Sequence, residues 1–187
     1  MIKKEIRVLG IDDSPFKKYQ KGEVLVVGTV FRGGSFLDGV LSTKVGIDGN
    51  DATEKLVQMI NSSKFKPQFQ CILINGIAVA GFNIIDIREL SEKTKIPVMV
   101  VIRKKPNVQL IKDTLAKINK KEKIALIEKA GSVIPAGKIY MQLAGIGIEK
   151  AKLILKITCT RSLIPEPIRM AHLIASGITD GQSRGKA

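Results

Sequence analysis

The first part of the chain alternates short apolar segments with turn signals, a pattern typical of β-strands. Ile6–Ile11 ends at Asp12-Asp13-Ser14-Pro15, and Glu23–Phe31 ends at Arg32-Gly33-Gly34-Ser35. Phe36–Ile47 follows that glycine-rich turn directly. Two strand patterns joined by such a turn predict a β-hairpin, so the chain is expected to open with one strand and a hairpin.

Downstream, helical and strand patterns alternate. Asp51 with Glu54 has the spacing of a helix capping box before an apolar stripe at Ala52, Leu56 and Ile60. Further helices are predicted at 82–93, 107–119, 148–156 and 166–176, and further strands at 71–74, 96–102, 124–128 and 139–143. This order predicts an α/β fold with a mixed central sheet and helices on both faces.

The length of 187 residues, of which 44% are hydrophobic, suits a single domain spanning 1–187. No apolar run approaches the roughly 18 residues that a membrane span needs. The start, Met1-Ile2-Lys3-Lys4-Glu5, lacks the anatomy of a signal peptide. A cytoplasmic protein that does not enter a membrane is therefore expected.

The chain has two cysteines and one histidine, too few for a usual four-ligand zinc site. Cys71 and Cys159 both lie in apolar segments. We therefore expect two buried thiols rather than a disulfide or a redox pair.

The net charge is +14, and it is uneven along the chain. Residues 1–100 hold 14 Lys and Arg against 11 Asp and Glu, whereas residues 101–187 hold 17 against 6. An excess of this size favours a polyanionic partner, most often DNA or RNA, over a surface that is charged only for solubility. Aromatic residues make up only 4%, so a stacking platform for bases is not expected.

Polar side chains follow three predicted strands. Asp12 and Asp13 end the first strand, Asp48 follows the third, and Asn75 ends the strand that begins at Cys71. Open α/β sheets bind ligands at such strand ends. Simple turn roles are equally compatible with these residues, and a turn at Asp48 with a helix cap at Asp51 is locally sufficient. The ligand interpretation predicts that the side chains of Asp12, Asp48 and Asn75 converge in one cleft.

Oxygen ligands of this kind would suit Mg²⁺ or Mn²⁺, ions often found where phosphate is transferred. An amide oxygen at position 75 adds no negative charge, so Asp12, Asp48 and Asn75 would hold the ion more weakly than three carboxylates. Near the end of the chain, Arg169 and Arg184 suit phosphate contacts. His172, three residues after Arg169, could relay a proton or bond a phosphate, although a lone histidine among apolar neighbours is more often a core residue.

The whole chain resembles an archaeal uncharacterised protein family, the domain of unknown function ninety-nine. The resemblance is carried by Gly10-Ile-Asp-Asp-Ser-Pro-Phe16, Asp48-Gly-Asn-Asp-Ala-Thr53, Asn75-Gly-Ile77, Gly81-Phe-Asn-Ile-Ile-Asp86, Arg103-Lys-Lys-Pro106 and Pro165-Glu-Pro-Ile-Arg-Met-Ala-His172. The last of these segments is distinctive.

That family is in turn similar to endonuclease V, a ribonuclease H-like nuclease that uses Mg²⁺ to cleave DNA or RNA near deaminated bases, chiefly inosine. The resemblance implies a ribonuclease H-like fold and a metal ligand at Asp12, with Asp48 near the position of a glutamate. Asn75 falls where endonuclease V has an aspartate, and Lys104 falls near a lysine that follows the next strand. The helix of Arg169 and His172 matches a late helix with polar site residues, and the tyrosine-bearing wedge segment has no counterpart.

Three hypotheses follow from the sequence. The chain is a metal-dependent nuclease, or a non-catalytic nucleic-acid-binding module on the same fold, or an enzyme that acts on a small phosphorylated or nucleotide substrate. The first two both predict salt-sensitive binding of nucleic acid, because phosphate contacts release counterions. Only the first predicts cleavage of DNA or RNA that Mg²⁺ or Mn²⁺ supports and that Asp12→Asn abolishes.

Overall fold

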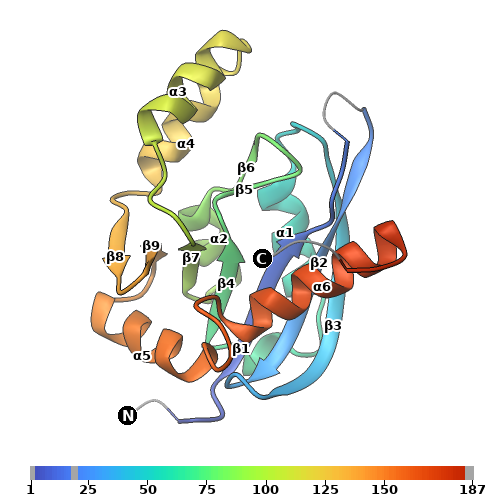
Figure 1. Cartoon of the computed structure of the whole chain (residues 1–187), viewed down its shortest axis with the longest axis vertical. Coiled ribbons are helices and arrows are strands. Elements are labelled where there is room, and N and C mark those ends of the chain that lie inside the picture. Colours follow the sequence, from blue (N-terminus) through green and yellow to red (C-terminus); the bar gives the residue numbers. More distant parts are fainter. Residues whose placement is uncertain (1–2, 18–20, 184–187) are drawn as a thin grey trace.

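The computed structural model describes residues 3–17 and 21–183, which form a mixed β-sheet between two layers of helices (Figure 1). Within these ranges the main sheet has seven strands in the order β3-β2-β1-β4-β7-β9-β8, and β5 and β6 form a separate short hairpin. The strands are β1 (Arg7–Asp13), β2 (Glu23–Arg32), β3 (Phe36–Gly46), β4 (Cys71–Asn75), β5 (Ala78–Val79), β6 (Asn83–Ile84), β7 (Val98–Ile102), β8 (Ile134–Ala136) and β9 (Ile139–Ala144). The helices are α1 (Ala52–Asn61), α2 (Ile87–Thr94), α3 (Val108–Lys117), α4 (Ile124–Lys129), α5 (Ile148–Thr158) and α6 (Glu166–Asp180), with short 3₁₀ turns η1 (Lys66–Gln68) and η2 (Lys121–Lys123).

The centre of the sheet is parallel and its edges are antiparallel. β4 pairs in parallel with both β1 and β7, whereas β2, β3, β8 and β9 all pair with an antiparallel neighbour. The predicted hairpin is confirmed, since β2 and β3 pair from Glu23–Gly46 to Arg32–Phe36. Gly33 in its turn has φ +55°, and a Cβ there would lie 2.4 Å from the carbonyl oxygen of Lys4. Only glycine fits this turn without a shift of the chain.

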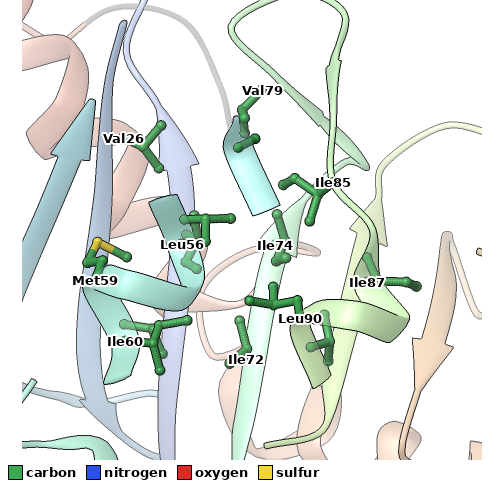
Figure 2. Packing of buried hydrophobic residues seen from close by; sticks show 14 of the residues in the cluster. Val26, Leu56, Met59, Ile60, Ile72, Ile74, Val79, Ile85, Ile87 and Leu90 are labelled. Atoms are coloured by element: carbon green, nitrogen blue, oxygen red, sulfur yellow. The ribbon is translucent and has the colours of Figure 1, made fainter. Parts of the chain in front are cut away.

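Each face of the sheet has its own apolar core, as the strand alternation requires. On one face, Ile72 and Ile74 of β4 pack with Leu56 and Ile60 of α1 and with residues of α2 (Figure 2). On the other face, Leu73 packs in a second cluster that is shared with α5 and α6. The prediction of helices on both faces of a mixed sheet is therefore confirmed.

Helix α6 lies very close to β1. A Cβ at Gly10 would lie 2.3 Å from the carbonyl carbon of Pro167, so only glycine allows this approach. The buried hydroxyl of Thr29 also donates a hydrogen bond of 2.6 Å to the carbonyl oxygen of Pro167. These two contacts fix the start of α6 against the sheet and determine where the rest of the helix lies.

Two predicted elements are wrong. Residues 124–128 were expected as a strand but form α4, because Ile124 and Ile127 join a helical cluster with Leu115 instead of pairing with a strand. The helix expected at 82–93 begins only at Ile87. Residues 83–84 form β6, and the side chain of Asp86 accepts hydrogen bonds from the backbone N–H groups of Arg88 and Glu89. Asp86 therefore sets the start of α2 as an N-cap residue.

The predicted capping box at α1 is also absent. The Asp51 carboxylate accepts hydrogen bonds from the backbone N–H of Gly46 and from the Asn83 side chain, so it does not cap its own helix. The carboxamide oxygen of Asn83 instead accepts from the N–H of Ala52 at 3.1 Å. A residue on the β6 strand thus satisfies the first turn of α1.

Among the described residues, no helix is both long enough and apolar enough to cross a membrane.

Candidate active site

Asp12 and Asn75 meet at the carboxyl ends of the two central strands. Pairing of β1 with β4 places Ile11 beside Ile74, so the next residue on each strand lies at the same edge of the sheet. The side-chain nitrogen of Asn75 donates a hydrogen bond of 3.1 Å to Oδ2 of Asp12. Asp12 itself is buried, with 3% of its surface exposed.

His172 joins this pair from helix α6. Its Nδ1 lies 3.1 Å from the same Oδ2 of Asp12, although the two residues are 160 positions apart in the chain. An ionised carboxylate can only accept, so beside it Nδ1 carries the proton and the acceptor of a neutral ring is Nε2. His172 is partly buried and contacts a carboxylate at a strand end, so it is not surrounded by apolar neighbours alone. We call Asp12, Asn75 and His172 the Asp12 cluster.

Asp13 faces the opposite side of the sheet. Its Oδ2 accepts a hydrogen bond of 2.7 Å from the backbone N–H of Ala80, in the turn between β5 and β6. Burial is the main reason why the pKa of Asp13 rises to about 6, and the nearby charge of Asp12 adds to the shift. The hydrogen bond from Ala80 opposes it. Adjacent acids at the end of β1 therefore have different surroundings.

Asp48 does not make a hydrogen bond with Asp12 or Asn75. Its Oδ1 accepts from the backbone N–H of Phe82 at 2.8 Å, and its own N–H donates to the carbonyl of Ala80 at the same distance. Asp48 has φ +53° and Ala80 has φ +47°, so two non-glycine residues in the left-handed region face each other here. Such strained backbone is concentrated at functional sites in known proteins.

The hairpin turn at Ala80–Phe82 lies between Asp13 and Asp48. Ala80 donates its N–H to Asp13 and accepts at its carbonyl from Asp48. A Cβ at Gly81 would lie 2.4 Å from Oδ1 of Asp48, so this turn needs glycine. Asp48 is thus linked to the Asp12 cluster through the hairpin and Asp13, but it is not a member of the cluster.

The predicted phosphate-binding residues are dispersed. Lys104 is exposed, two residues past the end of β7. Arg169 pairs with Glu166, with 2.8 Å from Nε and 2.7 Å from Nη2 to Oε2, so a buried carboxylate compensates its charge. Arg184 lies outside the described residues.

Arg103 is a further candidate, which the sequence indicated only as part of the segment Arg103-Lys-Lys-Pro106. It directly follows β7 and has the same parity as Met99 and Val101, which pack in the cluster shared with α5 and α6. Its Nε is buried and has no hydrogen-bond partner within the described part of the chain. A buried unpaired donor costs stability, so its presence at this edge of the sheet needs an explanation. The basic segment Arg103-Lys104-Lys105 was the only signal for it in the sequence.

A family model described as endonuclease dU matches residues 4–179. The chain belongs to the endonuclease dU family. A UPF0215 protein of Methanothermobacter thermautotrophicus is 49% identical over 191 residues, which cover all of this chain and 94% of that protein. The resemblance to an archaeal family that the sequence indicated is thereby confirmed.

Solved structures agree with this family and with its fold. A protein of unknown function from Archaeoglobus fulgidus superimposes with a TM-score of 0.86 at 40% identity, over 92% of this chain and 97% of that chain. Endonuclease V of Ciona intestinalis, in complex with inosine-containing DNA, gives a TM-score of 0.61 at 15% identity, over 94% and 86% of the two chains. The endonuclease dU family member thus shares the ribonuclease H-like fold of endonuclease V.

In the Asp12 cluster of this endonuclease dU family member, Asp12 and Asn75 are the residues with side-chain oxygens that could hold a Mg²⁺ or Mn²⁺ ion. Magnesium sites commonly use one or two protein carboxylates and complete their shell with water and substrate phosphate. Asp12 offers a buried carboxylate, and the side-chain nitrogen of Asn75 donates a hydrogen bond to Oδ2 of that carboxylate. Within residues 3–17 and 21–183, no group of three or more His, Cys, Asp or Glu side chains is placed to hold an ion.

Proposed function

We propose that this protein is a metal-dependent endonuclease that hydrolyses a phosphodiester bond of DNA or RNA beside a deaminated base. The observation that carries the proposal is the convergence of Asp12, Asn75 and His172 at the carboxyl ends of two parallel strands. The family name and the endonuclease V fold support a nuclease, and the name endonuclease dU favours deoxyuridine as the base.

In this proposal, Asp12 and the carboxamide oxygen of Asn75 would hold the ion, which would act as a Lewis acid toward the phosphate oxygens. Hydrolysis adds a water oxygen to phosphorus and breaks the bond to one nucleoside oxygen, which leaves with a proton. His172, whose Nδ1 contacts Asp12, would accept the proton of the attacking water at Nε2 and return it to the leaving oxygen. Arg103 donates to the scissile phosphate, which would give its buried Nε a partner.

A gel assay with labelled DNA and RNA that carry deoxyuridine, inosine or neither base tests the proposal. Each substrate is incubated with EDTA, Mg²⁺ or Mn²⁺ and with wild type, Asp12→Asn or His172→Asn. We expect cleavage only with metal, none with Asp12→Asn, and a loss of about 100- to 10,000-fold with His172→Asn. Glu92→Gln, an exposed carboxylate-to-amide change on α2, is the matched control and should cleave as wild type does.

The second candidate is a nucleic-acid-binding module without catalysis. The specific observation in its favour is that position 75 is an amide that donates to Asp12, where a nuclease would gain from a second carboxylate. In the same assay this candidate predicts retarded but intact strands in every lane. Cleavage or its absence in this assay therefore distinguishes the two candidate functions.

A further inference from the structure

Residues 103–129 form a compact basic unit at the edge of the sheet that carries the Asp12 cluster. The segment contains nine Lys and Arg against three Asp and Glu, so it contributes +6 of the net charge of +14. Its helices α3 and α4 stand beyond the ends of β4 and β7, beside the β5–β6 hairpin (Figure 1). We call residues 107–129 the arm and residues 103–106 its base.

The apolar side of the arm is packed on the hairpin. Leu115 and Ile127 of the arm join Ile84 of β6 in a small separate core, which Phe82 and Ile77 extend. The arm therefore has a fixed orientation relative to the turn that contacts Asp13 and Asp48.

Two lysines fasten the arm to the loops around the candidate active site. Nζ of Lys123 donates to three backbone carbonyls, those of Asp48 at 3.0 Å, Gly49 at 2.5 Å and Phe82 at 2.5 Å. Lys123 is 2% exposed, and Lys120 donates to the same carbonyl of Asp48. Both ammonium groups therefore make contacts within the protein. That of Lys123 is turned away from solvent, and that of Lys120 contacts a backbone carbonyl.

Two further cations of the arm are paired with acids. Lys112 lies 2.6 Å from Glu128, and Lys129 lies 2.5 Å from Asp86. The remaining exposed lysines have no ion pair with any residue in the described ranges; they are Lys104, Lys105, Lys117 and Lys121. These four leave the arm and its base with an uncompensated positive surface.

We propose that the arm carries the nucleic-acid strand that flanks the reacting phosphate, with phosphates on Lys104 and Lys105 at the base and on Lys117 and Lys121 farther out. The inference rests on the proposed function, because the Asp12 cluster sets where the strand begins. The pairing of Asn75 with Val101 places the base of the arm immediately beside that cluster. Helix α3 has ten residues, or about 15 Å, which corresponds to about four base pairs of duplex.

The test is a binding titration with Asp12→Asn protein, which holds its substrate uncleaved, and a fluorescently labelled duplex at several salt concentrations. Lys117→Gln/Lys121→Gln is compared with Lys150→Gln/Lys156→Gln, which removes the same charge from exposed positions on α5. Each lost phosphate contact should make the negative slope of log K against log salt less steep by about 0.9. The magnitude of the slope should therefore fall by about 1.8 in the arm variant. The α5 variant should lose less than half as much. Thermal melting checks that both variants are folded.

A second series shortens the duplex on one side of the modified base. Affinity should fall once fewer than about four base pairs remain on the side that the arm covers, and the arm variant should be insensitive to that shortening. Equal slopes for the arm and α5 variants, or no binding of DNA or RNA at all, would overturn the inference, and the latter would favour an acidic protein as the partner.

Cleavage by the same lysine variants in the wild-type Asp12 background separates the two proposals. If the wild-type protein shows no cleavage and the arm variant loses salt-dependent binding, the arm inference stands and the nuclease proposal fails. If wild type cleaves and the arm variant binds and cleaves equally well, the nuclease proposal stands and the arm inference fails.

Discussion

The side-chain nitrogen of Asn75 donates a hydrogen bond of 3.1 Å to the carboxylate of Asp12, across two parallel strands and 63 positions of sequence. This single contact places a neutral amide where a nuclease would gain from a second acid. The chemistry of position 75 is therefore open to a direct test.

Asn75→Asp should make the protein less stable in EDTA and more responsive to Mg²⁺. The change removes the hydrogen bond and puts a second carboxylate beside Asp12, at a cost of about 1–3 kcal/mol. Added Mg²⁺ should restore the stability, by about 2.7 kcal/mol at a hundred times its dissociation constant. Thermal melting with EDTA and with Mg²⁺ measures both effects. Asn75→Ala is the control, which should be destabilised without rescue; equal rescue of both variants would contradict the prediction.

Gly10→Ala should separate α6 from β1. The new Cβ would lie 2.3 Å from the carbonyl carbon of Pro167 and 2.6 Å from the nitrogen of Ile168. Both are backbone atoms, which cannot move away without shifting the helix. We expect a loss of about 1–3 kcal/mol in urea unfolding. Gly177→Ala, on the same helix, meets only Ser183 Oγ at 3.5 Å and should stabilise by about 1 kcal/mol. The same sign for both substitutions would show that α6 does not pack on β1 as described.

Lys123 should make stability rise with pH above about 8. Burial is the main reason why the pKa of Lys123 falls from 10.5 to about 8 in the folded protein, and the charge of Lys120 adds to the shift. Between these two values the unfolded state binds more protons than the folded state, so the free energy of unfolding rises with pH. Unfolding of wild type and Lys123→Met at several pH values isolates this contribution.

We expect the difference in stability between wild type and Lys123→Met to grow in favour of wild type from pH about 8 to about 10. Lys44→Met, an exposed change on β3, should show no such trend. A difference that stays constant across this range would mean that Lys123 keeps its proton, held by the three carbonyls.

Both thiols should react slowly in the folded protein. Burial raises the pKa of Cys71 to about 12 and is also the main reason why that of Cys159 rises to about 11. The thiolate is the reactive form, so little of it is present at neutral pH. Labelling with a thiol reagent, followed by mass spectrometry, should modify half-buried Cys159 before Cys71 and both at once after unfolding. Rapid modification of Cys71 in the native state would show that β4 is not buried as described.

Local pattern was enough to predict most of the sheet and the helices. The apolar run at Cys71–Ile74, the hairpin turn at Gly33-Gly34 and the Asn107 cap all depend on neighbours in sequence, and the structure has each of them. The pattern failed at 124–128 and at 82–86, where contacts with distant segments outweigh local preference. Asn83 caps α1 across 31 positions, and no local signal indicates such a contact.

The sequence by itself determined the alternation of buried and polar positions, the uneven positive charge, and the presence of Asp12 and Asn75 at strand ends. Parallel pairing of β1 and β4 then brings those two residues to one edge of the sheet. Only the tertiary structure decided that His172 joins Asp12 and Asn75, and that Asp48 makes its hydrogen bonds with the β5–β6 hairpin. The physical reason is that each of these contacts depends on how one element packs on another. The close approach of α6 to β1 likewise joins segments far apart in the sequence, and it requires glycine at position 10.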